Sequence, residues 1–181
     1  TAVCSSRASG LERRYSSYAR QLRRCTSKQE SADCINNLIT DLKDGIPDYS
    51  IFEKQFEKIM YTSRKEKDKK LVKYILKKLD TYYSSNELIP NSFTIEHVLP
   101  ESDEVEYVGM IGNLLPLGEQ LNSELSNKPF ELKIIRYPES QYTTVKKFVE
   151  ENKNKGKWGE EEIRERTKYI ANIMYNNIIA G

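Results

Sequence analysis

Apolar side chains recur every third or fourth residue along most of this chain, which is the spacing that gives an α-helix one apolar face. Long runs of this kind predict helices at 11–24, 27–42, 50–61, 67–83 and 160–179, and shorter runs predict helices at 118–127, from Pro129 onward and at 143–151. Apolar residues make up 38% of the chain and charged residues 31%, with only eight glycines and six prolines. This composition fits a folded, helix-rich protein.

The helical pattern is interrupted at Asn86. Two turn residues, Pro90 and Asn91, precede an alternating apolar stretch that predicts a short strand ending at His97. The apolar run at 110–117, MIGNLLPL, is too short and too rich in glycine and proline for a helix, and it fits a second strand. We therefore expect a mostly α fold, in which a helical array surrounds a small two-stranded antiparallel β-hairpin.

The length of 181 residues allows one sizeable core. We expect an N-terminal helical segment, 1–85, that packs on a core segment at 86–140, followed by C-terminal helices at 141–181. Together the three segments are expected to form one compact domain. Because the chain starts at Thr1 without a methionine, we also expect it to be a fragment of a longer protein.

Charged residues are unevenly distributed, although the net charge is only +2. Residues 1–25 hold six arginines and one glutamate, residues 51–80 hold ten lysines and arginines against five acidic residues, and residues 101–106 hold four acidic residues. Such segregation is consistent with a basic face that binds a phosphate backbone, but lysine-rich helices are more often simply solvated. Charge alone therefore leaves nucleic-acid binding open.

Other features argue against several classes of protein. No apolar run approaches the roughly 20 residues that cross a bilayer, and no signal peptide is recognisable. The three cysteines are odd in number and include no C-x-x-C pair, which indicates free thiols. The phosphate-binding pattern G-x-x-x-x-G-K-[ST] is absent, so nucleotide hydrolysis is not expected of this chain. We expect a cytoplasmic protein with neither a membrane partner nor a small-molecule cofactor.

The only histidine, His97, directly follows Glu96 in the stretch TIEHVLP. Asn113 lies on the second expected strand, and Asn122 lies on the short helix after it. This order, an acid–histidine pair, an asparagine and a third polar residue on a helix, resembles the HNH nuclease motif on its ββα-metal scaffold. The third position of that motif is often histidine, whereas here it is asparagine.

The wider sequence resembles one branch of these nucleases. The blocks IEHVLP, IGNLLPL and LNSELSNKPFELK, with Tyr137 beyond them, are similar to the C-terminal HNH domain of GmrSD-type restriction endonucleases. A later run with Trp158, Ile163 and Arg166 extends the likeness, which covers roughly residues 70–175.

The resemblance implies a metal-dependent DNA endonuclease or nickase of a bacterial defence system against foreign or modified DNA, attached to an N-terminal nucleotide-hydrolysing or modification-sensing domain. It implies catalytic roles for His97 and Asn113, and a site for Mg²⁺, or else Mn²⁺, at Glu96 and Asn122. The chemistry agrees, because a neutral imidazole can take a proton from water, and Mg²⁺ prefers few protein ligands. The side-chain carbonyl of Asn113 would accept the other ring N–H and fix the tautomer.

Alternatives remain open for each of these residues. A solitary histidine is often only packed, Asn113 follows a glycine and is also a typical turn residue, and Asn127 competes with Asn122 as metal ligand or ends the helix. Neighbouring residues of a strand point to opposite faces. Glu96 and His97 therefore share one site only if the strand ends or twists at this pair.

Three basic residues after the short helix, Lys128, Lys133 and Arg136, are candidates for contacts with DNA phosphates, or else form a solvated face. A non-catalytic helical module that binds DNA or a partner subunit is the competing function. RNA is a competing substrate, because a metal site recognises phosphate rather than sugar.

Overall fold

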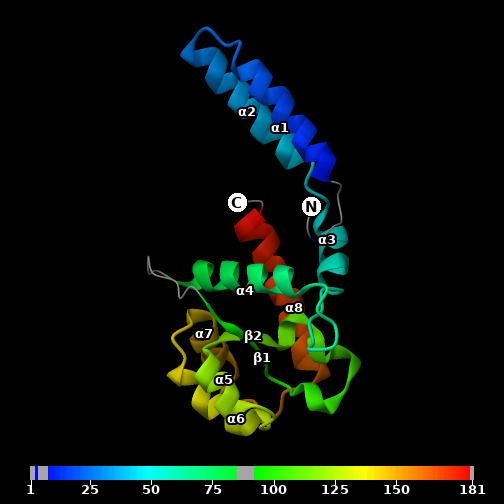
Figure 1. The fold of residues 1–181 in the computed structure, drawn as a ribbon, viewed down its shortest axis with the longest axis vertical. Coiled ribbons are helices and arrows are strands. Elements are labelled where there is room, and N and C mark those ends of the chain that lie inside the picture. The colour runs from blue at the N-terminus through cyan, green and yellow to red at the C-terminus, as the bar shows by residue number, and fades with distance from the viewer. Residues whose placement is uncertain (1–2, 4–7, 85–91, 180–181) are drawn as a thin grey trace.

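The computed structural model describes residues 3, 8–84 and 92–179, and the expected turn at Pro90 and Asn91 lies outside these ranges. Within them the chain is mostly helical, with one two-stranded antiparallel sheet (Figure 1). The predicted fold class is therefore confirmed. None of the described helices is both long and apolar enough to cross a membrane.

The first two helices form a pair that extends away from the rest of the molecule (Figure 1). Helix α1 spans Ala8–Leu22 and helix α2 spans Lys28–Asp44, with Ser27 capping α2 through its side chain. The Arg14 guanidinium joins the two helices by donating to the Asp41 carbonyl at 2.9 Å. Within the predicted N-terminal segment, it is the later helices that pack on the core.

Two of those later helices pack with the last helix around the first of two apolar cores. Helix α3 spans Tyr49–Phe56, α4 spans Lys69–Tyr83 and α8 spans Glu160–Ile173, which continues as a π-helical turn over Met174–Ile179. The buried apolar side chains of this core include Phe52, Phe56, Val72, Ile75, Leu76, Leu79 and Ile170. Burial of this apolar surface fixes α4 beside the hairpin.

The hairpin lies between α4 on one side and helices α5, α6 and α7 on the other (Figure 1). Strand β1 spans Thr94–His97 and strand β2 spans Leu114–Leu117, and the two are antiparallel. The second strand is shorter than predicted, because Ile111–Asn113 forms a 3-10 turn before it. Asn113 thus lies just ahead of the strand on which it was expected.

Three short helices and a second apolar core cover the other face of the hairpin. Helix α5 spans Glu119–Leu125, α6 spans Phe130–Arg136 directly after Pro129, and α7 spans Thr143–Asn152. The second core includes Val98, Leu115, Leu117, Leu125, Phe130, Tyr137, Phe148 and Trp158. The short hairpin is therefore packed between two cores, which holds the strand that carries His97 in place.

Helix α8 approaches the turn before β2 so closely that only glycine fits at position 112. A Cβ atom on Gly112 would lie 2.0 Å from the Ile163 carbonyl oxygen and 2.8 Å from the Thr167 nitrogen. The Gly112 N–H donates to the Thr167 hydroxyl at 3.0 Å. This contact fixes Asn113, the next residue, against α8.

Candidate functional site

Strand β1 stays paired with β2 through its last residue, His97, which lies opposite Leu114. Its side chains therefore alternate, and Glu96 and His97 point to opposite faces of the hairpin. Glu96 faces the second core, where it contacts Lys133, whereas the His97 ring contacts Tyr61. Strand β1 ends at His97 with its pairing intact up to that residue, so the two side chains stay on opposite faces and the expected common site of Glu96 and His97 does not form.

The His97 ring is held by two groups from outside the hairpin. Its Nε2 lies 2.9 Å from the Tyr61 carbonyl oxygen and 3.2 Å from Glu101 Oε1. Because a carbonyl oxygen can only accept, Nε2 carries the proton and donates it, which leaves the lone pair on Nδ1. The Tyr61 ring also stacks on the imidazole, with centroids 5.9 Å apart. The geometry thus selects one tautomer.

Both holding groups are themselves fixed. The Tyr61 N–H donates to the Gly109 carbonyl at 2.9 Å, next to a β-bridge between Met60 and Met110. The Glu101 carboxylate accepts from the Ser63 N–H at 2.7 Å and from the Ser63 hydroxyl at 2.6 Å. The proton on Nε2 therefore points into a pre-organised pair of acceptors.

Burial lowers the pKa of His97 below its usual value of 6.5, and this effect outweighs the Tyr61 carbonyl and the Glu101 carboxylate, which raise it. The ring is thus neutral at pH 7. Nδ1 of His97 has no hydrogen-bond partner among the described residues, and the side chain as a whole is about 10% exposed.

Asn113 does not contact the imidazole, which corrects the predicted role of its carbonyl in fixing the ring. The side-chain oxygen Oδ1 of Asn113 accepts from the Leu99 N–H at 2.8 Å and from the Trp158 indole N–H at 3.1 Å. The Asn113 amide N donates to the Leu99 carbonyl at 2.9 Å and to the Val108 carbonyl at 2.7 Å. Asn113 therefore clamps the loop that follows His97.

Glu96 is buried beside a cation of the protein itself. Its Oε1 lies 2.8 Å from Lys133 Nζ and accepts from the Tyr137 hydroxyl at 2.9 Å. Lys133 also donates to the His97 carbonyl at 2.6 Å and has no exposed surface. The predicted contact of Lys133 with a DNA phosphate is therefore wrong: the apolar packing of α6 turns this lysine inward.

The pair of predicted metal ligands does not fit a Mg²⁺ site. The Glu96 carboxylate is already neutralised by Lys133, and a divalent ion beside that ammonium would be repelled. Asn122 donates through its side-chain amide N to Thr94 Oγ1 at 2.8 Å and to the Ile95 carbonyl at 3.3 Å, which leaves only its side-chain oxygen Oδ1 without a partner among the described residues. In the part of the chain that is described, no three His, Cys, Asp or Glu side chains gather as metal ligands would.

The remaining predicted residues lie at the surface. Ser126, rather than Asn127, is the C-cap residue of α5, and Asn127 is exposed. Arg136 is half-buried and pairs with Glu124 at 2.9 Å and with Glu139. Lys128 is exposed and forms no ion pair with any residue in the described ranges. Of the three predicted phosphate contacts, Lys128 alone remains unpaired.

Comparison with protein families decides the identity of the chain. Residues 46–173 match the family described as GmrSD restriction endonucleases, C-terminal domain. The chain belongs to this family. The match spans α3 to α8, so it includes the hairpin and His97, and it confirms the resemblance of the sequence blocks. No curated protein matches the chain.

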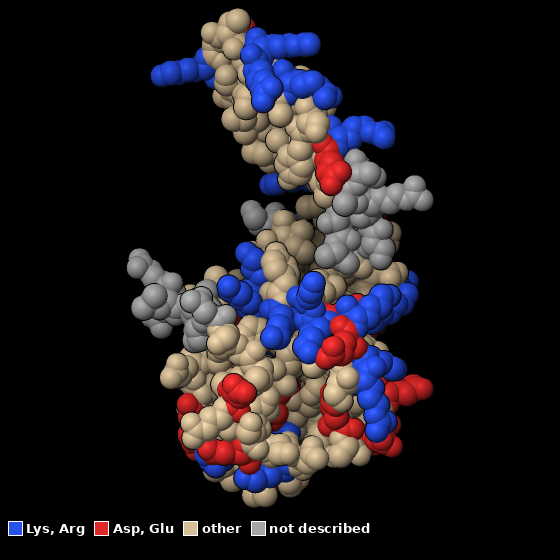
Figure 2. All heavy atoms as spheres, in the orientation of Figure 1, with Lys and Arg blue, Asp and Glu red and all other residues tan. Residues whose placement is uncertain are grey.

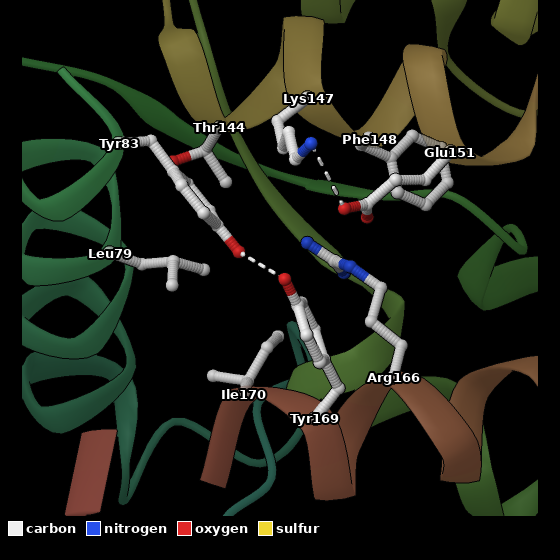
Figure 3. Close-up of a pocket in the computed structure, with 9 residues that line it drawn as sticks. All are labelled: Leu79, Tyr83, Thr144, Lys147, Phe148, Glu151, Arg166, Tyr169 and Ile170. Atoms are coloured by element: carbon white, nitrogen blue, oxygen red, sulfur yellow. Dashed lines mark hydrogen bonds and ion pairs between the residues drawn. The ribbon is translucent and has the colours of Figure 1, made fainter. Parts of the chain in front are cut away.

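This GmrSD C-terminal domain also has a small hollow between α4, α7 and α8 (Figure 3). The Tyr83 hydroxyl donates to the Tyr169 hydroxyl across it at 3.3 Å. Arg166, at its edge, donates to the Gly112 carbonyl at 2.6 Å and to the Leu114 carbonyl at 3.1 Å. Arg166 thus joins α8 to the hairpin, which explains its place in the family pattern without a catalytic role.

Sequence reasoning missed the groups that hold His97. Tyr61 acts through its backbone carbonyl, 36 residues earlier, and no residue type announces such a contact. Glu101 lies four residues after His97 in an acidic loop, and that spacing was the one available signal. Both contacts with His97 arise because the segment before α4, which holds Tyr61 and Ser63, lies against the hairpin and the loop after it.

Proposed function

We propose that this GmrSD C-terminal domain is an HNH-type nuclease that hydrolyses phosphodiester bonds of DNA, with His97 as the general base. The observation that carries the proposal is the fixed tautomer of His97: Nε2–H donates to the Tyr61 carbonyl, and the Nδ1 lone pair has no hydrogen-bond partner among the described residues. The family, a family of restriction endonucleases, supports DNA as the substrate.

In the proposed reaction, Nδ1 takes a proton from a water molecule, whose oxygen attacks the phosphorus in line with the departing oxygen. The bond from phosphorus to the 3′ oxygen breaks, and solvent supplies a proton to that oxygen. The products are a 5′-phosphate and a 3′-hydroxyl. The imidazolium formed in this step is stabilised by Glu101 Oε1, which lies 3.2 Å from Nε2.

Dependence on Mg²⁺ or Mn²⁺ is part of the proposal, because the phosphate needs charge neutralisation during attack. It does not rest on a site at Glu96, whose carboxylate is paired with Lys133. It does not rest on Asn122 either, because Asn122 donates to Thr94, whose side chain lies on the Glu96 face of β1 and not on the His97 face. We further propose a bacterial, cytoplasmic defence protein with an N-terminal nucleotide-hydrolysing or modification-sensing domain as the setting.

The test is cleavage of supercoiled plasmid by this chain, with Mg²⁺, with Mn²⁺ and with a chelator. We expect nicking with a divalent ion, none with chelator, and ends that a ligase rejoins because they carry 5′-phosphate and 3′-hydroxyl groups. A wild-type chain that binds plasmid yet nicks it under no condition is a non-catalytic module. Matched DNA and RNA duplexes in parallel reactions decide between the two substrates.

A further inference from the structure

The outward face of α4 carries four exposed lysines, Lys70, Lys73, Lys77 and Lys78, with the exposed Tyr74 among them. We name these four lysines the α4 row. Figure 2 shows the cationic side chains gathered as a band over α4 and the segment before it. The opposite face of α4 is fixed in the first apolar core, so the row is presented by a rigid element.

The four lysines of the α4 row gather on one helix face without acidic partners, whereas several other cationic side chains of the surface are paired. Arg64, Lys69 and Lys147 each form an ion pair with a glutamate within 4.0 Å. No member of the α4 row forms one with any residue in the described ranges.

The helix itself offers no compensating charge at this surface. Asp80, its one acidic residue, is buried and accepts a hydrogen bond from the Thr144 N–H at 2.8 Å. Like charges one helical turn apart, such as Lys73 and Lys77, repel each other. An external polyanion would relieve this repulsion.

The N-terminal end of α4 lies close to the candidate base. Lys69, in the first turn of α4, places its ammonium 5.6 Å from the centre of the Tyr61 ring, and that ring stacks on the His97 imidazole. Two acidic groups near this end of α4 are paired with cations, Glu104 with Arg64 at 3.0 Å and Glu66 with Lys69 at 2.6 Å. A backbone lying along α4 therefore reaches the neighbourhood of His97.

We propose that the α4 row binds the phosphate backbone of duplex DNA and directs the scissile strand toward His97; the choice of DNA rests on the proposed function. From Lys70 to Lys78 the row covers about 12 Å of helix axis at about 1.5 Å per residue. DNA carries one phosphate per about 3.4 Å of axis on each strand, so the row matches three to four phosphates. Contacts of this kind position a duplex without reading its sequence.

The test uses two variants in a His97→Ala background, so that DNA binding is measured without cleavage. In the row variant, Lys70, Lys73, Lys77 and Lys78 are changed to Gln. In the control variant, four exposed lysines of other elements are changed to Gln, which removes the same charge: Lys146, Lys153, Lys157 and Lys168. Binding of a labelled DNA duplex is followed by fluorescence anisotropy over a range of salt concentrations.

We expect the row variant to bind about tenfold or more weakly at moderate salt, and the slope of log Kd against log salt to fall by about three to four. The control variant is expected to stay within about twofold of the parent, with an unchanged slope. Equal losses in both variants, an unchanged row variant, or a loss confined to duplex RNA would overturn the inference. Plasmid nicking by the unmutated chain is scored separately, so failure of the proposed function is distinguished from failure of the α4 row.

Discussion

The imidazole of His97 is held in one tautomer by a carbonyl that lies 36 residues earlier in the chain. A buried histidine with both nitrogens bonded would be a packing residue, whereas Nδ1 of His97 has no hydrogen-bond partner among the described residues. The single residue that sequence reasoning placed at the centre of the site is thus held in the tautomer that the proposed base requires.

The tautomer can be measured directly, because the chain has one histidine. We expect long-range ¹H–¹⁵N NMR spectra at pH 7 to show a neutral ring protonated on Nε2. Burial lowers the pKa of His97, so the ring stays neutral as the pH falls to 6.5 and takes up its second proton only below that value. Replacing Glu101 with Gln removes a charge that raises this pKa, and should move the midpoint lower still. A ring protonated on Nδ1, or a midpoint above 6.5, would contradict this account.

The pairing of Lys133 with Glu96 predicts a structural role for the lysine. Changing Lys133 to Met leaves the buried Glu96 carboxylate without its counter-ion, and should lower the free energy of unfolding by about 3–5 kcal/mol. The double variant Lys133→Met with Glu96→Gln removes both charges and should recover most of this loss. Urea unfolding of the wild type, the single variant and the double variant measures these free energies of unfolding. If Lys133→Met weakens DNA binding but leaves unfolding unchanged, Lys133 is a phosphate contact after all.

At the scale of elements, the helices and the hairpin follow from local patterns. The alternation before His97 predicted a strand that ends there, and β1 does end there. Pro129 predicted a helix start, and α6 begins at the next residue. These predictions succeeded because turn chemistry and apolar spacing act over a few residues.

What local patterns could not supply is contact between distant elements. MIGNLLPL predicted a strand over its whole length, but the close approach of α8 at Gly112 bends its first half into a 3-10 turn. That bend brings Asn113 to the loop after His97 instead of to the ring. Likewise, Lys133 has the sequence character of a surface residue, and only the packing of α6 shows that it is buried.

The contact at Gly112 is testable at this scale. Changing Gly112 to Ala forces a Cβ against the Ile163 carbonyl oxygen, and should cost at least about 1–3 kcal/mol of unfolding free energy through overpacking. Gly156 is a matched control, because a Cβ there meets nothing within 4 Å. Thermal unfolding should show a clearly lower midpoint for Gly112→Ala and little change for Gly156→Ala. Equal midpoints for the two variants would mean that α8 can move away from the turn.

At the scale of the whole molecule, two cores hold the hairpin, and the helix pair α1–α2 extends away from them (Figure 1). The family match begins at residue 46, after this pair, so the region that defines the family coincides with the region that is packed. Within it, the face that carries the α4 row and the segment that holds His97 adjoin through Tyr61. This arrangement places the proposed phosphate-binding row and the proposed base in the same packed region.

The central claim, that His97 is the base of a nuclease, is tested most directly by the single-turnover rate of plasmid nicking. The rate of His97→Ala is compared with that of the wild type and of Glu161→Gln, a variant at an exposed position of α8. We predict a loss of about 10²–10⁴-fold for His97→Ala, with DNA binding retained, and an unchanged rate for Glu161→Gln. A folded His97→Ala variant that nicks plasmid at the wild-type rate would contradict the account.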